Sequence, residues 1–215
     1  MWLMPNARVL RVWNDVEGAV ELAVSTLERG GLVVYPTETC YGLAADITNV
    51  DAVIKVYKAK RRPMDRSLTA IVSDLGMWMD YAYLDAKALK LIRRFNPGPL
   101  TIATWKKPTV PDIVNPRAFA ARISSHKVAT MIVKKLGRPI TATSANIHGE
   151  ANPYSVDDVS RQMGGSVDLI LDCGILPLRP VSTIVDLTYN PPRIERVYPH
   201  GSFRLEEILE VLSNC

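Results

Sequence analysis

The sequence predicts one α/β domain with a twisted, open sheet that mixes parallel and antiparallel strands and is flanked by helices. Short apolar and β-branched runs alternate with amphipathic helical segments along the 215 residues, as is typical of this class. Strand-like runs that follow each other directly in the last third predict some antiparallel pairing. No linker, repeat or low-complexity tract divides the chain. We therefore expect a single domain over residues 1–215, a length that allows a substantial core.

The first half of the chain is expected to contain three helices and three strands. Asp15 can cap a helix that runs to about Arg29, where two glycines follow. Asn49 starts a second helix, which Pro63 ends. A third helix over 85–95 stops at the turn Asn-Pro-Gly-Pro. The strands are expected where short apolar runs lie between these breaks, at 32–35, 68–72 and 100–105.

The second half continues the same alternation. A strand over 118–123 precedes a helix over 126–136, and the run that begins at Pro139 forms another short strand. Ser155 and Asp158 open a further helix through a capping-box-like pair, in which Asp stands where Glu or Gln is usual. The remaining elements are strands at 169–171, 182–187 and 193–196 and a final amphipathic helix at 203–212.

Composition excludes several classes of protein. The chain is 47% hydrophobic and 22% charged with a net charge of +4, which is typical of a globular protein and mildly favours anionic partners such as nucleotides or RNA. There is no signal-peptide pattern and no apolar run of membrane-helix length. Cys40, Cys173, Cys215 and the three histidines lack metal-ligand spacing. We expect a soluble cytoplasmic protein with reduced cysteines, no membrane association and no structural metal.

Four unusual segments fall in order along the chain. They are 35–43 (Tyr-Pro-Thr-Glu-Thr-Cys-Tyr-Gly-Leu), the basic run 58–66, the turn and strand 96–101 (Asn-Pro-Gly-Pro-Leu-Thr), and 139–149, which contains Ser-Ala-Asn. Each segment alone is most simply a turn or a solvated helix end. In this order, the set resembles the YrdC/TsaC-like family, the threonylcarbamoyl-AMP synthases of tRNA modification. The resemblance covers roughly residues 17–210 and implies a short, single-domain form with a concave basic cleft.

The basic run offers ligands for phosphate. Lys60, Arg62 and Arg66 are expected to project from irregular backbone just before a strand. A guanidinium suits bidentate phosphate contact, and a lysine suits neutralisation by a point charge. Lys60 and Arg62 match the family's Lys-x-Arg motif, which implies that both contact the phosphates of ATP and are catalytic, with Arg66 assisting. The sequence contains no P-loop, so side chains such as these would have to bind the phosphates.

The segment 36–43 matches the family signature Pro-Thr-[Glu/Asp]-Thr-x-Tyr-Gly-Leu at every specified position. The resemblance implies that Thr39, with Thr37 and Tyr41, lines a pocket for L-threonine. Cys40 occupies the variable position of the signature. Because no base is evident near it, we interpret Cys40 as a small buried residue and not as a nucleophile.

Two later residues complete the expected L-threonine site. Arg122 matches an arginine that holds the carboxylate of the amino acid, a role suited to a bidentate guanidinium. Ser182 matches a serine in the same pocket. Near Arg122 the chain departs from the family pattern, because Ser124 stands where proline is usual.

The resemblance assigns a second group of residues to ATP. Ser144 and Asn146 match the family's Ser-x-Asn pair, which contacts the nucleotide. Asn152 falls where some relatives place another polar contact to ATP. Arg196 matches a late strand arginine that reaches ATP, although its surroundings differ from the usual short Arg-x-Gly.

The implied function is ATP-dependent condensation of L-threonine with bicarbonate to give threonylcarbamoyladenylate and pyrophosphate. ATP is a substrate and carries Mg²⁺, and no nucleophilic side chain is required. The product would pass to a transferase that modifies a tRNA adenosine, and direct contact with tRNA or another RNA is possible. Two alternatives remain open: a paralogue that acts mainly by binding RNA, and an enzyme that adenylates a carbamoyl or acyl group on a different amine.

Overall fold

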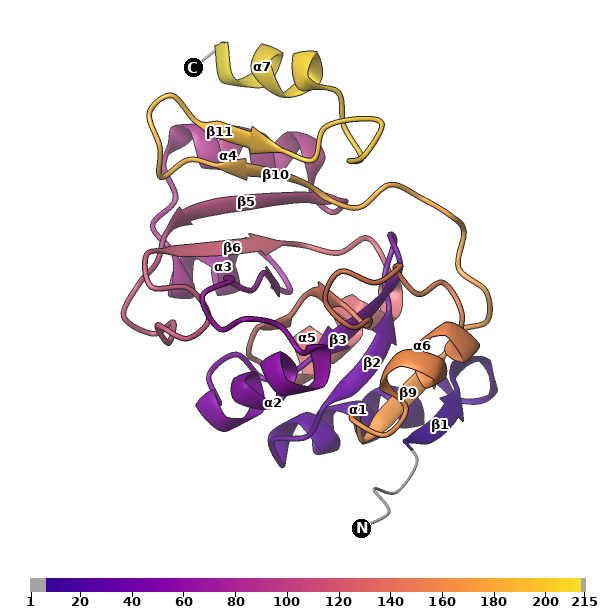
Figure 1. The fold of residues 1–215 in the computed structure, drawn as a ribbon. Coiled ribbons are helices and arrows are strands. Elements are labelled where there is room, and N and C mark those ends of the chain that lie inside the picture. The colour runs from indigo at the N-terminus through magenta and orange to yellow at the C-terminus, as the bar shows by residue number, and fades with distance from the viewer. Residues whose placement is uncertain (1–6, 214–215) are drawn as a thin grey trace.

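The computed structural model describes residues 7–213 and contains two sheets, one above the other in Figure 1. The five-stranded sheet has the order β1 (Arg8–Arg11), β9 (Leu169–Asp172), β2 (Val33–Pro36), β3 (Tyr41–Ala44) and β8 (Thr143–Ser144). The six-stranded sheet has the order β11 (Arg193–Glu195), β10 (Thr183–Asp186), β5 (Leu100–Trp105), β6 (Ala118–Arg122), β4 (Ala70–Ile71) and β7 (Ile140–Thr141). Both sheets mix parallel and antiparallel pairs, for example β2 with β9 and β2 with β3. The α/β class and the mixed pairing are confirmed, whereas the strands form two sheets and not one.

Helices cover both faces of the five-stranded sheet and one face of the six-stranded sheet. They are α1 (Val16–Glu28), α2 (Val50–Lys60), α3 (Leu75–Tyr81), α4 (Ala86–Phe95), α5 (Lys127–Leu136), α6 (Val156–Met163) and α7 (Leu205–Ser213), with a short 3₁₀ helix at Val12–Asn14. Helices α1 and α5 pack together against the five-stranded sheet through a shared apolar cluster. Helix α4 lies behind the six-stranded sheet and contacts α7. The opposite face of the six-stranded sheet carries Ala103 and Ala120, which lie outside this helix-covered core.

One apolar core extends across both sheets. It contains Val34 and Leu43 from the five-stranded sheet and Ile102, Ala121 and Val185 from the six-stranded sheet. All five side chains are fully buried. The two sheets therefore belong to one folded unit. No helix within residues 7–213 is long and apolar enough to cross a membrane.

Several helix starts confirm the local signals in the sequence. The side chain of Asp15 accepts a hydrogen bond from the N–H of Gly18, and that of Asn49 accepts one from Ala52. At α6 the capping box is complete, because Ser155 Oγ accepts from the N–H of Asp158 at 3.1 Å and Asp158 Oδ2 accepts from the N–H of Ser155 at 3.1 Å. Aspartate thus performs the role usually taken by glutamate.

Replacing Ser155 with Ala is expected to lower the free energy of unfolding by about 1 kcal/mol, because the N–H of Asp158 loses its acceptor at the start of α6. Urea unfolding of both proteins measures the difference. Replacement of Ser160 by Ala, which lies inside the same helix and is exposed, is the control. Equal destabilisation by the two substitutions would contradict the capping role.

The structure corrects the sequence-based elements in four places. Strand β1, strand β3 and helix α3 were not expected, and β3 lies where we expected a turn. Helix α2 ends at Lys60 and not at Pro63. Arg61 ends this helix in the left-handed region at φ 49°, and its N–H binds the carbonyl oxygen of Lys58 at 3.1 Å. Lys60 therefore belongs to the last helical turn and does not project from irregular backbone.

Candidate active site

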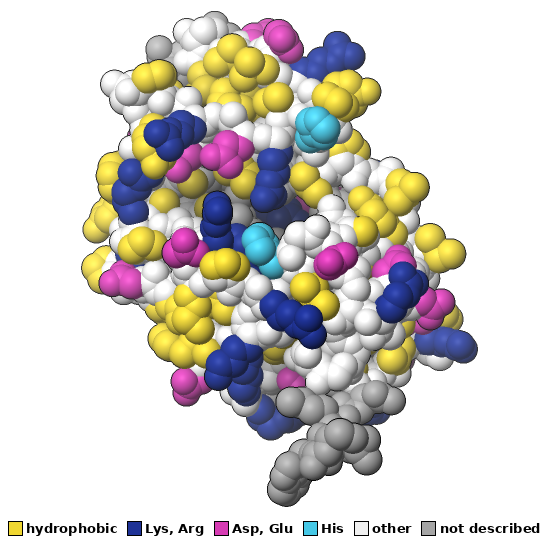
Figure 2. Space-filling view, in the orientation of Figure 1, with side chains coloured by type: hydrophobic (Ala, Val, Ile, Leu, Met, Phe, Trp, Pro, Cys, Tyr) yellow, Lys and Arg dark blue, Asp and Glu magenta, His cyan; other side chains and the backbone are white. Residues whose placement is uncertain are grey.

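A cleft of about 580 Å³ lies between the two sheets. Figure 2 shows this hollow near the middle of the molecule, with Lys and Arg side chains around it. Basic side chains in its lining outnumber acidic ones, with Lys60, Arg62, Arg66, Arg122 and Arg196 facing Glu150, Asp186 and Glu195. Eleven of the twelve predicted site residues line the cleft, namely Thr37, Thr39, Lys60, Arg62, Arg66, Arg122, Ser144, Asn146, Asn152, Ser182 and Arg196.

Strand pairing brings two of the sequence motifs together. Strand β3, which follows the turn at residues 37–40, pairs with β8 so that Gly42 lies opposite Ser144. Next to this pair, the N–H of Ala145 donates to the carbonyl oxygen of Tyr41 at 2.9 Å. A side chain at residue 42 would crowd the ring of Tyr35, since a Cβ there would lie 3.1 Å from it. Close packing of this kind places the threonine-rich turn beside the Ser-Ala-Asn segment.

Lys60 connects α2 to the Ser-Ala-Asn segment from below. Its side chain is only 2% exposed. The ammonium group donates to the carbonyl oxygen of Ser144, to the carbonyl oxygen of Asn146 at 2.8 Å and to Asn146 Oδ1 at 3.3 Å. Burial and the charge of Arg62 lower the pKa of Lys60 to about 7, while the oxygen acceptors favour the ammonium form. Lys60 thus holds the shape of this segment as well as lining the cleft.

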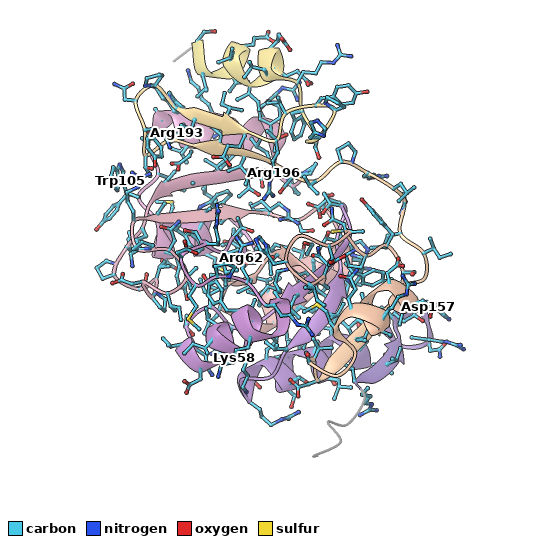
Figure 3. All side chains as sticks on the ribbon, viewed as in Figure 1. Lys58, Arg62, Trp105, Asp157, Arg193 and Arg196 are labelled. Carbon is cyan, nitrogen blue, oxygen red and sulfur yellow. The ribbon has the colours of Figure 1, made fainter. Side chains whose placement is uncertain are left out.

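Arg62 is fixed by its own backbone neighbours. Its Nε donates to the carbonyl oxygen of Arg66 at 3.2 Å, and its Nη2 donates to that of Ser67 at 2.9 Å. Nη1 lies 3.3 Å from His148 Nδ1. Since a guanidinium can only donate, Nδ1 accepts and the proton of neutral His148 resides on Nε2. In Figure 3 Arg62 and Arg196 approach the cleft from opposite sides, whereas Lys58 lies on the outer side of α2.

Arg122 forms a buried ion pair with Glu38. Its Nε donates to Glu38 Oε1 at 2.9 Å, and the two side chains are 4% and 5% exposed. The Oγ of Ser124 donates to the other carboxylate oxygen, Oε2. Burial alone would raise the pKa of Glu38, but Arg122 and the Ser124 hydroxyl hold it below its ordinary value. Within residues 7–213, no hydrogen bond of Arg122 uses Nη1 or Nη2, so these atoms can serve a ligand.

The threonine-rich turn is organised by Thr37. Its Oγ1 donates to the carbonyl oxygen of Cys40 at 2.6 Å and accepts from the N–H groups of Thr39 and Cys40, each at 3.2 Å. Thr39 Oγ1 lies 3.0 Å from Thr37 Oγ1. Burial raises the pKa of the Cys40 thiol to about 11, so Cys40 is not a thiolate at neutral pH, in agreement with its interpretation as a small buried residue.

Tyr41 is the one predicted site residue that does not line the cleft. Its ring is fully buried. Its hydroxyl donates to the carbonyl oxygen of Gly174 at 2.7 Å and accepts from the N–H of Cys173 at 2.9 Å. Because alternate residues of a strand point to opposite faces, the side chain of Tyr41 faces the core behind the cleft. Tyr41 therefore anchors the chain after β9, and its side chain does not line the cleft.

The structure adds cleft residues that sequence reasoning missed. The floor on the six-stranded sheet is shallow, because Ala103 and Ala120 lie opposite each other across β5 and β6. On β10, Asp186 pairs with Ala103, and Ile184 is the next residue on the same face. Polar groups at its rim include Asn115, Asp186 and Glu195. Small alternating residues on 100–105 and 118–123 were the available signal, but strand pairing had to be known before they could be placed together.

Comparisons with known proteins agree with this arrangement. A family model named Sua5/YciO/YrdC and described as "Telomere recombination" matches residues 25–197. A threonylcarbamoyl-AMP synthase of Pyrococcus abyssi is 34% identical over 91% of this chain and 58% of its own length. A putative threonylcarbamoyl-AMP synthase of Methanocaldococcus jannaschii is 37% identical over 78% of this chain and 80% of its own length.

Solved structures show the same fold. The crystal structure of P. abyssi Sua5 complexed with L-threonine superposes with a TM-score of 0.85 at 32% identity, covering 96% of this chain and 60% of that one. The chain thus spans less than two thirds of the length of the P. abyssi protein. Escherichia coli YciO superposes with a TM-score of 0.74 at 26% identity, covering 82% of this chain and 87% of that one. The family match over residues 25–197 and the identities above 30% show that the chain belongs to the Sua5/YciO/YrdC family.

Proposed function

We propose that the protein is an L-threonylcarbamoyladenylate synthase. The reaction joins L-threonine, bicarbonate and ATP and releases pyrophosphate and water. The observation that carries the proposal is one cleft that combines a buried arginine with free Nη atoms and a group of three further basic side chains, Arg62, Arg66 and Arg196. The names of the relatives from P. abyssi and M. jannaschii support the same activity.

In this proposal L-threonine binds between the turn at 37–40 and the six-stranded sheet. Arg122 receives the carboxylate through Nη1 and Nη2, which suit a bidentate contact. Thr39 and Ser182 also line the cleft and would offer hydroxyl groups to the ligand. The P. abyssi Sua5 structure with bound L-threonine supports an amino-acid site in this fold.

ATP would occupy the remainder of the cleft. Arg62, Arg66 and Arg196 are placed to bind the phosphates, and Lys60 holds Ser144 and Asn146 in position beside them. Asn152 lies in the same wall. The apolar floor formed by Ala103, Ala120 and Ile184 suits the flat face of a purine. Mg²⁺ would enter with ATP, because phosphate oxygens are its preferred ligands.

The chemistry requires positioning and charge stabilisation. The threonine amine and bicarbonate form a carbamate and water, and a carbamate oxygen then attacks the α-phosphorus of ATP. The bond from this phosphorus to the bridging oxygen breaks, and pyrophosphate leaves with the electron pair. The arginines spread the charge of the phosphates in the transition state. No side-chain nucleophile takes part, and Cys40, held as a thiol by its raised pKa, is consistent with that route.

The test is pyrophosphate release from ATP and Mg²⁺, measured with and without L-threonine and with and without bicarbonate. Release that needs both compounds is the expected result. No release, together with no binding of ATP or L-threonine by calorimetry, would contradict the proposal and favour the RNA-binding alternative. Release that depends on bicarbonate and on an amine other than threonine would favour the alternative adenylating enzyme.

The apolar floor gives a second test of the nucleotide's position. Replacing Ala120 with Leu adds bulk opposite Ala103 and is expected to weaken ATP binding about 100-fold or more, because the base loses its flat surface. L-Threonine affinity should fall much less than ATP affinity, since Arg122 and Thr39 are unchanged. Calorimetry with each ligand measures both values. An equal decrease in the affinities for ATP and L-threonine would contradict this placement of the base.

The wider role follows the same proposal. The labile product would be consumed by a transferase that acts on a tRNA adenosine, and the site of synthesis would be the cytoplasm. Direct contact with tRNA would be an additional property and not a requirement of the cleft chemistry.

A further inference from the structure

Behind the cleft, Glu38 occupies a position that the proposed reaction does not use. It lines a separate cavity of about 230 Å³ with Thr39, Pro99, Ser125 and Arg179, and it does not line the cleft itself. Its carboxylate nevertheless contacts Arg122, which does line the cleft. Glu38 thus acts from outside the ligand space on a residue inside it.

Both oxygen atoms of Glu38 have defined partners. Oε1 accepts from Arg122 Nε at 2.9 Å, and Oε2 accepts from Ser124 Oγ. Ser124 Oγ in turn accepts from the N–H of His126 at 3.1 Å. The start of α5 therefore fixes the serine, the serine fixes the carboxylate, and the carboxylate fixes the plane of the guanidinium. A proline at position 124, which is the usual residue of the family pattern, has no hydroxyl to make this link.

Charge balance is the second consequence of the pair. Arg122 and Glu38 are almost fully buried, and together they carry no net charge. A neutral receptor in a region of low dielectric constant favours a ligand whose own net charge is zero. A free α-amino acid is such a ligand, because its ammonium group offsets its carboxylate. Arg122 alone would instead favour any carboxylate, with or without an amine.

We propose that Glu38, held by Ser124, is the positioning residue of Arg122 and neutralises it, so that the cleft selects a zwitterionic α-amino acid over a carboxylate that lacks the amine. This inference rests on the proposed binding of L-threonine at Arg122. The selection matters for the reaction, since a carboxylate without an amine would occupy the site and form no carbamate.

The test compares two ligands by calorimetry on the full chain. The first ligand is L-threonine. The second is (R)-3-hydroxybutyrate, which has the carboxylate and hydroxyl groups of threonine but lacks the amine. The ratio of their affinities should favour threonine in the unmodified protein. Replacement of Glu38 by Gln keeps the shape and removes the charge, and it should lower this ratio about tenfold or more. A purely structural role would weaken both ligands alike and leave the ratio unchanged.

A second variant tests the same inference through the dependence of the affinity ratio on pH. The charged and titratable groups that face Glu38 determine which pH range is informative. They are Arg122 on β6, Tyr35 on β2, Cys40 on the same turn and His126 at the start of α5, and Arg179 lines the same cavity as Glu38. Burial raises the pKa values of Tyr35 and Cys40 and lowers that of His126, and the arginines stay charged, so only Glu38 and His126 gain a proton as the solution is made acidic.

Replacement of Ser124 by Ala removes a hydrogen bond that stabilises the ionised form of Glu38. The pKa of Glu38 should rise in this variant. On acidification, the ratio of threonine to hydroxybutyrate affinity should therefore begin to fall at a higher pH than it does in the unmodified protein. His126 is present in both proteins, and its N–H loses the Ser124 Oγ acceptor in the variant. The exposed neighbour Ser125, replaced by Ala, is the control and should follow the unmodified curve.

The outcomes separate this inference from the proposed function. Two results support the inference: a lower ratio of threonine to hydroxybutyrate affinity for Glu38→Gln, and a fall of this ratio at a higher pH for Ser124→Ala than for the unmodified protein. An unchanged ratio in folded Glu38→Gln, or coincident pH curves for Ser124→Ala and the unmodified protein, would overturn it while threonine binding stands. Failure of the unmodified protein to bind L-threonine would instead overturn the amino-acid site itself.

Discussion

Replacing Lys60 with Ala is expected to reduce pyrophosphate release by about 100- to 1,000-fold, because the segment that would contact ATP loses its support. The ammonium group donates to oxygen atoms of Ser144 and Asn146, and the side chain is 2% exposed. Without it, buried oxygen atoms have no donor and a cavity remains. The free energy of unfolding should fall by about 3 kcal/mol or more for the same reason.

Two comparisons separate these effects. Lys60→Met keeps most of the volume and removes the charge, so it should restore stability lost to the cavity but not activity. Lys58→Ala removes a lysine from the outer face of the same helix and should leave both stability and activity unchanged. Activity is measured as threonine-dependent pyrophosphate release and stability by urea unfolding. Normal ATP affinity in a folded Lys60→Ala protein would show that the segment does not depend on this lysine.

Replacing Arg122 with Met is expected to destabilise the fold by about 3–5 kcal/mol at neutral pH, because Glu38 then remains buried and charged without its partner. Threonine affinity should fall about 100-fold or more, as expected when a buried charged hydrogen-bond partner is removed. In the variant, burial without Arg122 raises the pKa of Glu38 in the folded state, so the carboxyl group favours folding at low pH and opposes it as pH rises. In the unmodified protein the pKa of Glu38 is lowered, and the stability it contributes is lost as pH falls. The difference in stability between the two proteins should therefore narrow on acidification.

A double variant tests the cause of that loss. Adding Glu38→Gln to Arg122→Met removes the unpaired charge and should recover much of the stability at neutral pH, while threonine binding stays absent. Thermal unfolding over a range of pH and calorimetry with L-threonine provide the two measurements. An Arg122→Met protein that matches the original in stability and threonine affinity would contradict both roles of the ion pair.

Local signals explain which parts of the fold were predictable. Helix caps depend on a few neighbouring residues, and Asp15, Asn49 and Ser155 act as the sequence indicates. Strand β5 occupies the predicted residues Leu100–Trp105 because an apolar run lies there after a turn that stops the preceding helix. The division of strands between two sheets was not predictable in this way, since the pairing of β3 with β8 joins residues about a hundred positions apart.

For the site residues, the sequence likewise predicted some properties and not others. Their presence in one cleft followed from the family resemblance, and the structure places all of them there except Tyr41. Their contacts did not follow, because a motif names a residue without showing what its side chain touches. The sequence therefore offered no sign that Lys60 supports a neighbouring segment or that Arg122 is neutralised by Glu38.

The division of the cleft between two sheets has a consequence for heat resistance. A ligand that touches Ser144 on one sheet and Arg122 on the other acts as a non-covalent cross-link between them. At 100 times its dissociation constant, one such ligand stabilises the folded state by about 2.7 kcal/mol. Occupied molecules should therefore survive heating and proteolysis that unfold empty ones, and the abundance of the protein in a cell would follow the supply of the ligand that fills the cleft.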